Sequence, residues 1–476
     1  MRKAATAAVT AATVLVLAGG YAGLDAGGVV PGPLTTTPAP TAPALPTAPA
    51  ATRPAQDPQA VLPALDPDAP RPDPAVLGGD LAPFLGDPAL GAEVSASVRD
   101  ALTGDDLLSD GVDVPRTPAS VTKVLTAVAA LRALGPTSRA ATTVVDGATP
   151  DEVVLLAGGD VLLGAGAGNP DAVDGHAGLD DLAAATATKL LAAGRTAVAV
   201  RLDDSAFSGP TTSAGWGSGD VAAGFVAPIA PLAVDEGRLA AGETAPRDPD
   251  PALAAARTFA AALAAHGVRV LDPGGGVVRA SAVPGAATIA SVRSATTAEQ
   301  VEFMLTTSDN TLAEVLARRV ALATDRQGTF DDASRAVVDQ IAALGLDVSG
   351  TALQGGSGLG RDTRIPARVV TDVLVLVAAG KHPELGSVAA GLPVAGVSGT
   401  LLDRYDQPDS AAAAGVVRAK TGTLTGVSSL AGYVRDTDGR LLAFAVMSDS
   451  VAPGGSASAR RAQDRFATAL LACGCW

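Results

Sequence analysis

Three short motifs that lie far apart in the chain constrain its fold more than any other feature. They are Ser-Val-Thr-Lys at 120–123, Ser-Asp-Asn at 308–310 and Lys-Thr-Gly at 420–422. Alone, each motif is common: the first usually starts an exposed helix, the second usually caps one and the third usually lies in a turn. All three in this order predict a fold that brings remote segments together at one site.

The first motif pairs a hydroxyl with an amine. Ser120 and Lys123 are three residues apart in a segment whose apolar residues recur at helical spacing, so both side chains lie on one face. A serine hydroxyl is a poor nucleophile at neutral pH and needs an adjacent base. A lysine can be that base when burial or a second cation lowers its pKa. We therefore expect Ser120 to be a nucleophile and Lys123 its general base.

The third motif lies on a predicted strand that can form the opposite wall of the site. Lys420 would be the second cation, and with Thr421 it can hold a terminal carboxylate by charge and hydrogen bond. Gly422 lets a substrate backbone approach closely. The N–H groups of Thr423 and Ser120 would together bind an oxyanion, close to the positive N-terminal end of the helix.

The second motif completes the predicted site. We expect Ser308 to relay a proton between Lys123 and a leaving amine, and Asn310 to orient a substrate amide. The histidines at 176, 266 and 382 belong to no catalytic triad or metal motif. No phosphate-binding or zinc-protease motif occurs, so we expect neither a metal nor a cofactor.

Charge and the chain ends set further limits. The net charge is −15 and no basic run occurs, which argues against nucleic-acid binding. Residues 1–26, a basic start and an apolar stretch, are typical of a signal peptide or an uncleaved anchor. Either would place the rest outside the cytoplasm, with membrane contact only through the anchor. Outside the cytoplasm, Cys473 and Cys475 could form a disulfide at the C-terminus.

The remaining sequence predicts a linker and two folded parts. Residues 27–76 are rich in Pro and Thr and behave as an extended linker. We expect a main domain at 77–139 and 290–476, with an inserted domain at 140–289. Predicted strands cover 93–99, 415–420, 428–434 and 441–447, and Asp438-Gly439 predicts a hairpin between the last two. Predicted helices cover 179–193, 252–266, 366–379 and 457–472, and a helical region covers 296–344.

The chain resembles the D-Ala-D-Ala carboxypeptidases of the S13 peptidase family, the class C low-molecular-mass penicillin-binding proteins. The resemblance covers about residues 77–472 and includes Pro118–Lys123, Leu156–Asp160, Asp203–Phe207, Gly356–Leu359, Leu392–Gly396, Gly399–Leu401 and Lys420–Val427. It implies the α+β serine β-lactamase/DD-peptidase fold. In that fold helices flank an antiparallel sheet, a helical lobe carries Ser308 and Asn310, and a region is inserted between the first two motifs.

The resemblance also implies a reaction. Cell-wall stem peptides ending in D-Ala-D-Ala would acylate Ser120, D-Ala would leave, and water would hydrolyse the acyl-enzyme. β-Lactams would inhibit covalently, and a DD-endopeptidase activity on cross-links stays open. One departure from the family is that Ala230–Glu236 leads almost directly to the helix at 252, so a nested strand module of full members is expected to be missing.

Two other functions compete with this one. A β-lactamase needs a deacylation base, and Glu314 fits better as part of the helix after Asn310. A non-catalytic wall-binding protein would not need all three motifs intact.

Overall fold

The structure, a computed structural model, describes residues 66–272 and 276–473. The predicted signal or anchor, most of the expected linker and Cys475 lie outside these residues. Helix α2 (Pro74–Leu85) overlaps the end of the expected linker, because the Asp73 carboxylate accepts hydrogen bonds from the first turn and Pro74 opens the helix. Among the described residues no single helix is long and apolar enough to span a membrane. One pair of helices joined by a sharp bend, Ala367–Ala378 with Pro383–Gly391, is long and apolar enough when the two are taken together.

Five antiparallel strands form the sheet that carries the third motif. The spatial order is β13 (Arg418–Leu424), β14 (Val427–Arg435), β15 (Leu441–Ser448), β1 (Val94–Asp100) and β2 (Asp106–Asp110). The predicted hairpin between β14 and β15 is confirmed, with Arg435 paired to Leu441 and Gly439 at φ 94°. The strand predicted over 415–420 instead begins at Arg418 and ends at Leu424, because pairing with β14 continues to Val427. Lys-Thr-Gly therefore lies inside an edge strand.

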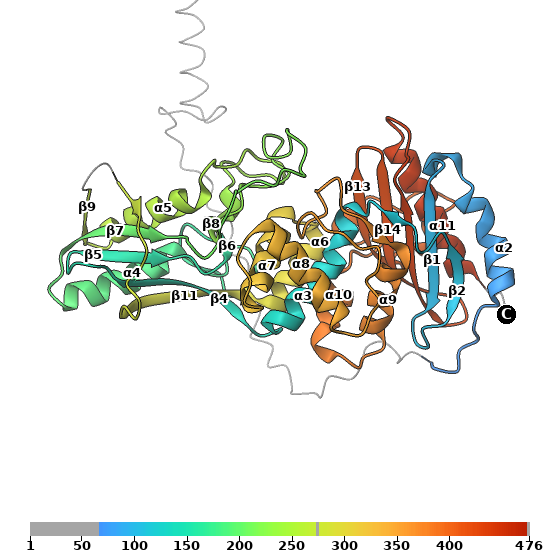
Figure 1. Ribbon diagram of the computed structural model, residues 1–476, viewed down its shortest axis with the longest axis horizontal. Coiled ribbons are helices and arrows are strands. Elements are labelled where there is room, and N and C mark those ends of the chain that lie inside the picture. Colours follow the sequence, from blue (N-terminus) through green and yellow to red (C-terminus); the bar gives the residue numbers. More distant parts are fainter. Residues whose placement is uncertain (1–65, 273–275, 474–476) are drawn as a thin grey trace, which may run out of the picture. The chain divides into compact units, whose positions relative to one another are not determined.

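Helices cover both faces of this sheet (Figure 1). Helix α2 and helix α11 (Ser456–Ala472) pack on one face, where Leu77 and Phe466 share a core with Phe444. Helix α9 (Ala367–Ala378) packs on the other face. There Tyr433 and Ala443 join the core of the helical lobe. The expected α+β architecture with a helical lobe is confirmed.

The helical lobe surrounds helix α3 (Thr122–Leu134), which is buried from Thr122 to Leu131. A helix that is apolar on nearly every side belongs in a core. The helices around it are α6 (Thr297–Thr307), α7 (Asn310–Ala323), α8 (Phe330–Ala342) and α10 (Gly386–Gly391). The first motif thus opens the central helix and the second lies at the α6–α7 junction.

The part of the chain between the first two motifs in the sequence forms a second sheet with its own core. Its strands are β4 (Arg139–Asp146), β5 (Glu152–Leu156), β7 (Ala197–Asp203), β9 (Arg269–Leu271), β10 (Val278–Arg279) and β11 (Thr288–Thr296). Helices α4 (Leu179–Ala192) and α5 (Pro251–Ala265) share its core, which contains Leu155, Val200 and Phe259. This separate core supports the proposal of an inserted domain at 140–289, whose boundaries stay a prediction.

Two short strand pairs and a turn complete the described fold. Strand β6 (Asp160–Leu163) pairs with β8 (Leu232–Val234), and β3 (Pro115–Arg116) pairs with β12 (Ile365–Pro366). A left-handed turn, Asp235–Gly237, follows β8. Residues 238–250, all described, then contain one isolated bridge, between Arg238 and Arg247. The proposal that a nested strand module is missing concerns this stretch.

Candidate active site

Ser120 lies in a single 3₁₀ turn, Ala119–Val121, that leads directly into α3. The turn is held tightly from two sides. A Cβ on Gly358 would lie 2.0 Å from the carbonyl oxygen of Ala119, and one on Gly422 would lie 2.4 Å from that of Pro118. Ala119 has φ 48°, a left-handed conformation that costs a non-glycine residue free energy. Close packing by the two glycines therefore holds a strained turn and leaves Ser120 half-buried at the surface of the cleft.

The amine of Lys123 is fully buried and has three acceptors around it. Its Nζ lies 2.8 Å from Ser120 Oγ, 2.6 Å from Asn310 Oδ1 and 2.8 Å from the carbonyl oxygen of Ser357. Burial lowers the pKa of Lys123 to about 7, against the opposing effect of the Asp309 and Glu314 carboxylates. A substantial fraction of the amine is therefore neutral at neutral pH, as a general base requires.

Ser308 and Lys420 form the second pair of the site. Ser308 ends α6 in a left-handed conformation with φ 62°. The fully buried Lys420 donates to Ser308 Oγ over 2.8 Å and to the carbonyl oxygen of Thr421 over 3.0 Å. Burial, and then the charge of Lys123, lower the pKa of Lys420 well below its usual value. The expected relay serine thus contacts the second lysine of the site.

Asn310 is the first residue of α7, after the helix cap Asp309. Its Oδ1 accepts from Lys123, and its Nδ2 donates to the carbonyl oxygen of Phe225 over 2.9 Å. Because an amide has one acceptor end and one donor end, these two partners determine which end faces Lys123. Asn310 therefore links the base to the segment before β8.

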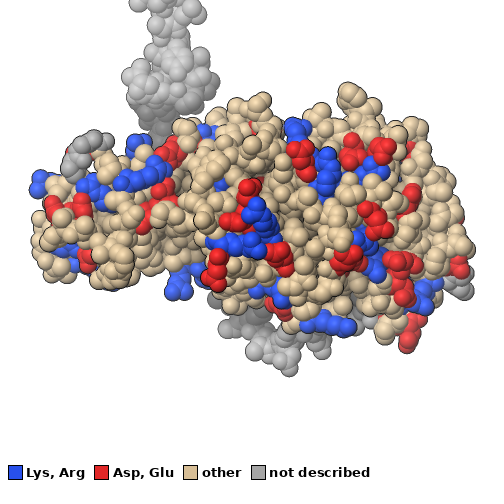
Figure 2. Space-filling model, in the orientation of Figure 1, with Lys and Arg blue, Asp and Glu red and all other residues tan. Residues whose placement is uncertain are grey.

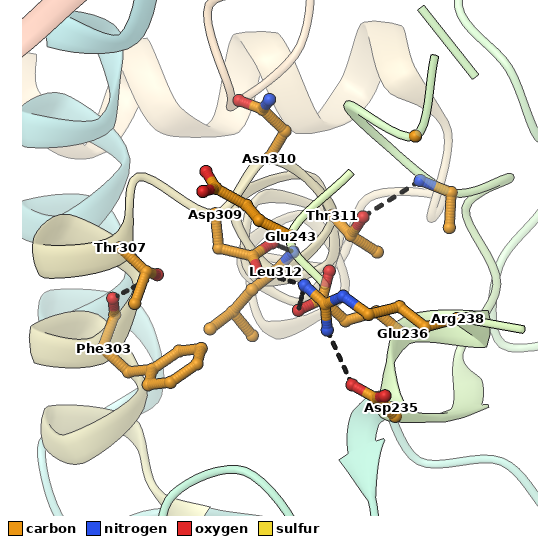
Figure 3. A network of polar contacts seen from close by, with 12 residues as sticks. Asp235, Glu236, Arg238, Glu243, Phe303, Thr307, Asp309, Asn310, Thr311 and Leu312 are labelled. Atoms are coloured by element: carbon orange, nitrogen blue, oxygen red, sulfur yellow. Dashed lines mark hydrogen bonds and ion pairs between the residues drawn. The ribbon is translucent and has the colours of Figure 1, made fainter. Parts of the chain in front are cut away.

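A charged network supports the cap of α7 (Figure 3). The Arg238 guanidinium lies 3.1 Å from the Glu236 carboxylate and 3.8 Å from that of Asp309. Burial and the neighbouring Asp309 raise the pKa of Glu236 well above its usual value. Asp235 and Glu236 both have positive φ. The strained turn after β8 thus packs beside the second motif.

Thr421 of the third motif and Thr423, which follows the motif, line the cleft. The hydroxyl oxygens of Thr421 and Thr400 lie 2.7 Å apart, and Thr423 is exposed. A cavity of about 420 Å³ is lined by Ser120, Ser308, Asn310, Thr421 and Thr423, among others. A neighbouring cavity of about 700 Å³ shares Ser308 and Asn310 with it. The structure therefore brings all three motifs together, with the two buried lysines in contact with the serines that line the cleft.

Three groups near the base were not predicted as site groups. Two are backbone carbonyl oxygens, of Ser357 and Phe225, and the third is the buried carboxylate of Glu314. A backbone carbonyl carries no signal of residue type, although Gly356–Leu359 stood out as a family landmark. Among the described residues no group of three potential metal-ligand side chains gathers. The rings of His176, His266 and His382 contact Arg139, Asp180 and Glu384 respectively.

The chain is similar to known proteins over most of its length. The model of the D-Ala-D-Ala carboxypeptidase 3 (S13) family matches residues 77–249 and 243–470. Carboxypeptidase DacB of Mycolicibacterium smegmatis is 40% identical to this chain, and the match covers 86% of this chain and 87% of the length of DacB. Carboxypeptidase Rv3627c of Mycobacterium tuberculosis is 39% identical over 87% of each chain. The crystal structure of penicillin binding protein 4 from Haemophilus influenzae has a TM-score of 0.68 at 22% identity, covering 82% of this chain and 98% of that one.

Proposed function

The chain belongs to the D-Ala-D-Ala carboxypeptidase 3 (S13) family, and from this premise we propose that it is a serine-type D-Ala-D-Ala carboxypeptidase whose nucleophile is Ser120. The observation that carries the proposal is the 2.8 Å contact between Ser120 Oγ and a buried lysine amine. Burial gives that amine a pKa of about 7, so it can accept the hydroxyl proton near neutral pH.

In the acylation step, Ser120 Oγ attacks the carbonyl carbon of the penultimate D-Ala while its proton passes to Lys123. The oxyanion is bound by the N–H groups of Ser120 and Thr423, two residues that line the same cavity. Because β13 is an edge strand, one row of its backbone groups faces away from the sheet. The C–N bond then breaks, and the proton held by Lys123 passes through Ser308 to the nitrogen of the leaving D-Ala.

The second lysine and its neighbour recognise the substrate. Lys420 and Thr421 hold the terminal carboxylate of a stem peptide, while Asn310 orients the base and offers its second amide hydrogen to the peptide. Hydrolysis of the acyl-enzyme by water restores Ser120. A β-lactam presents a strained amide and a carboxylate to the same groups, so it acylates Ser120 and inhibits. The same cleft would serve a DD-endopeptidase reaction on cross-links.

The substrate also sets the location of the enzyme. Cell-wall peptides lie outside the cytoplasm, so we propose an exported protein in which residues 1–26 act as signal or anchor. The net charge of −15 argues against a polyanionic substrate. On the face drawn in Figure 2, Lys and Arg side chains are interspersed with Asp and Glu.

The test uses the purified full-length protein and a labelled penicillin. We expect one stable adduct, which mass spectrometry places on the peptide containing Ser120, and release of D-Ala from a pentapeptide ending in D-Ala-D-Ala. Ser120→Ala should abolish both, while Ser109→Ala, a change at an exposed serine on β2, should change neither. Rapid turnover of the penicillin would instead indicate a β-lactamase, and absence of any adduct would contradict a catalytic serine.

A further inference from the structure

Glu314 lies on α7, one helical turn after Asn310, and is completely buried beneath the site. Its two carboxylate oxygens are occupied by one loop. Oε2 accepts from the N–H of Gly356 over 2.9 Å, and Oε1 accepts from the N–H of Ser357 over 3.0 Å and from the Ser357 hydroxyl. Since both oxygens are engaged and water is excluded, this carboxylate does not serve as a base that activates water.

We propose that Glu314 is a positioning residue for the base Lys123, acting through residues 355–358. The idea rests on the proposed function, because it concerns the same acylation of Ser120. Ser357 connects the two side chains: its N–H and hydroxyl donate to Glu314, and its carbonyl oxygen accepts from Lys123 Nζ over 2.8 Å. The Glu314 carboxylate therefore fixes the position of Ser357, and the carbonyl oxygen of Ser357 fixes the position of the Lys123 amine.

The loop touches α7 so closely that only glycine fits at two positions. A Cβ on Gly355, which has φ 98°, would lie 2.6 Å from both carboxylate oxygens of Glu314. A Cβ on Gly356 would lie 2.6 Å from the Cβ of Ala317. On the other side, the carbonyl oxygen of Gly356 accepts from the Thr126 hydroxyl over 2.7 Å. The loop therefore connects α7 to α3 with little room to move.

This connection matters because of the geometry of a neutral amine. Neutral Lys123 has two N–H bonds and one lone pair. When the two N–H groups donate to Asn310 Oδ1 and to the Ser357 carbonyl, the lone pair is left to face Ser120 Oγ, at 2.8 Å. Moving the Ser357 carbonyl frees the amine to rotate, and a base must lie within hydrogen-bond reach of the proton that it takes.

Glu314 also contributes charge. Its hydrogen-bond partners, the N–H groups of Gly356 and Ser357 and the Ser357 hydroxyl, all donate to it. An ionised carboxylate is acceptor-only, although burial raises the pKa of Glu314 above its usual value. Three other charged groups face this pair: Asp309, which acts on Lys123; Lys420, whose own pKa the charge of Lys123 lowers; and Arg318, one turn along α7, which acts on Glu314. The negative charge of Glu314 raises the pKa of Lys123, so its removal should lower that pKa.

The test measures the rate constant of acylation by a labelled penicillin from pH 5 to 9, in the full-length protein. We expect Glu314→Gln to lower the maximal rate about 10- to 100-fold, because the base is misplaced. We also expect the pH at half-maximal rate to move downward. Asp331→Asn, at an exposed carboxylate of α8, is the matched control and should leave the profile unchanged.

A second variant keeps the charge and removes the two hydrogen bonds of the Ser357 hydroxyl, which donates to Glu314 and accepts from the N–H of Leu359. Ser357→Ala should lower the maximal rate severalfold with an unmoved pH midpoint, and it decides the question if Glu314→Gln does not fold. An unchanged rate in Ser357→Ala, or a slower but unshifted Glu314→Gln at wild-type thermal stability, would overturn the proposal. Because wild type is measured alongside, lack of acylation in wild type would contradict the proposed function itself.

Discussion

Lys123 Nζ lies 2.8 Å from Ser120 Oγ, and the lysine side chain that carries it has no exposed surface. An amine in water would stay protonated at neutral pH and could not accept a proton. Burial reverses this, because it penalises the charged form. The catalytic predictions below follow from this contact and from the groups that hold it.

The pH dependence of acylation should report the pKa of Lys123. Since the neutral amine is the active form, the rate should rise as the pH rises through about 7 and level off above it. Below that midpoint the rate should fall about tenfold per pH unit. Single-turnover labelling of the full-length protein between pH 5 and 9 measures this curve. A midpoint near the pKa of an ordinary exposed lysine would show that burial does not lower the pKa of the base.

Lys123→Arg should keep the positive charge and lose the base. A guanidinium stays protonated over the whole working range of pH, so the acylation rate should fall about 10²- to 10⁴-fold. Lys189→Arg, at an exposed lysine on α4, is the matched control for the substitution. Comparable thermal unfolding of both variants would separate lost chemistry from lost structure. Near-normal labelling of Lys123→Arg would rule out Lys123 as the base.

Asn310→Asp should move the pH profile in the direction opposite to Glu314→Gln. The new carboxylate would lie where Oδ1 is now, 2.6 Å from Lys123 Nζ, and an opposite charge at that distance raises the pKa of a lysine. It also could not donate to the Phe225 carbonyl. We expect slower acylation at pH 7, partly regained at higher pH. The same rate profile tests it, and an unmoved midpoint would argue against the Asn310–Lys123 contact.

Gly422→Ala should disturb the turn that carries Ser120. The added methyl would lie 2.4 Å from the Pro118 carbonyl oxygen and 3.3 Å from the Ser120 nitrogen. Forcing extra volume into a packed site costs about 1–3 kcal/mol, so both the unfolding midpoint and the acylation rate should fall. Gly79→Ala on α2 meets nothing within 4 Å and should stabilise the helix by up to about 1 kcal/mol. Equal stability of the two variants would contradict the close approach of β13.

Much of the local structure followed from the sequence. Helical spacing predicted α4, α5, α9 and α11 to within about two residues, and Asp438-Gly439 predicted its hairpin. The pairing of Ser120 with Lys123 followed from their spacing, because residues three apart share one side of a helix. The start of β13 was predicted too early, since strand ends depend on the partner strand, which a single segment does not contain.

The sequence by itself determined the three motifs, their order and the elements that carry them, because these depend on residue type and local spacing. Only the tertiary structure decided how the base is held. The acceptor on Ser357 lies 234 residues from Lys123 and is a backbone atom, which every residue possesses. The burial that lowers the pKa of Lys123 likewise comes from helices remote in the chain. These contacts could not be predicted from the sequence, because the partners lie far apart in the chain and a backbone atom does not depend on residue type.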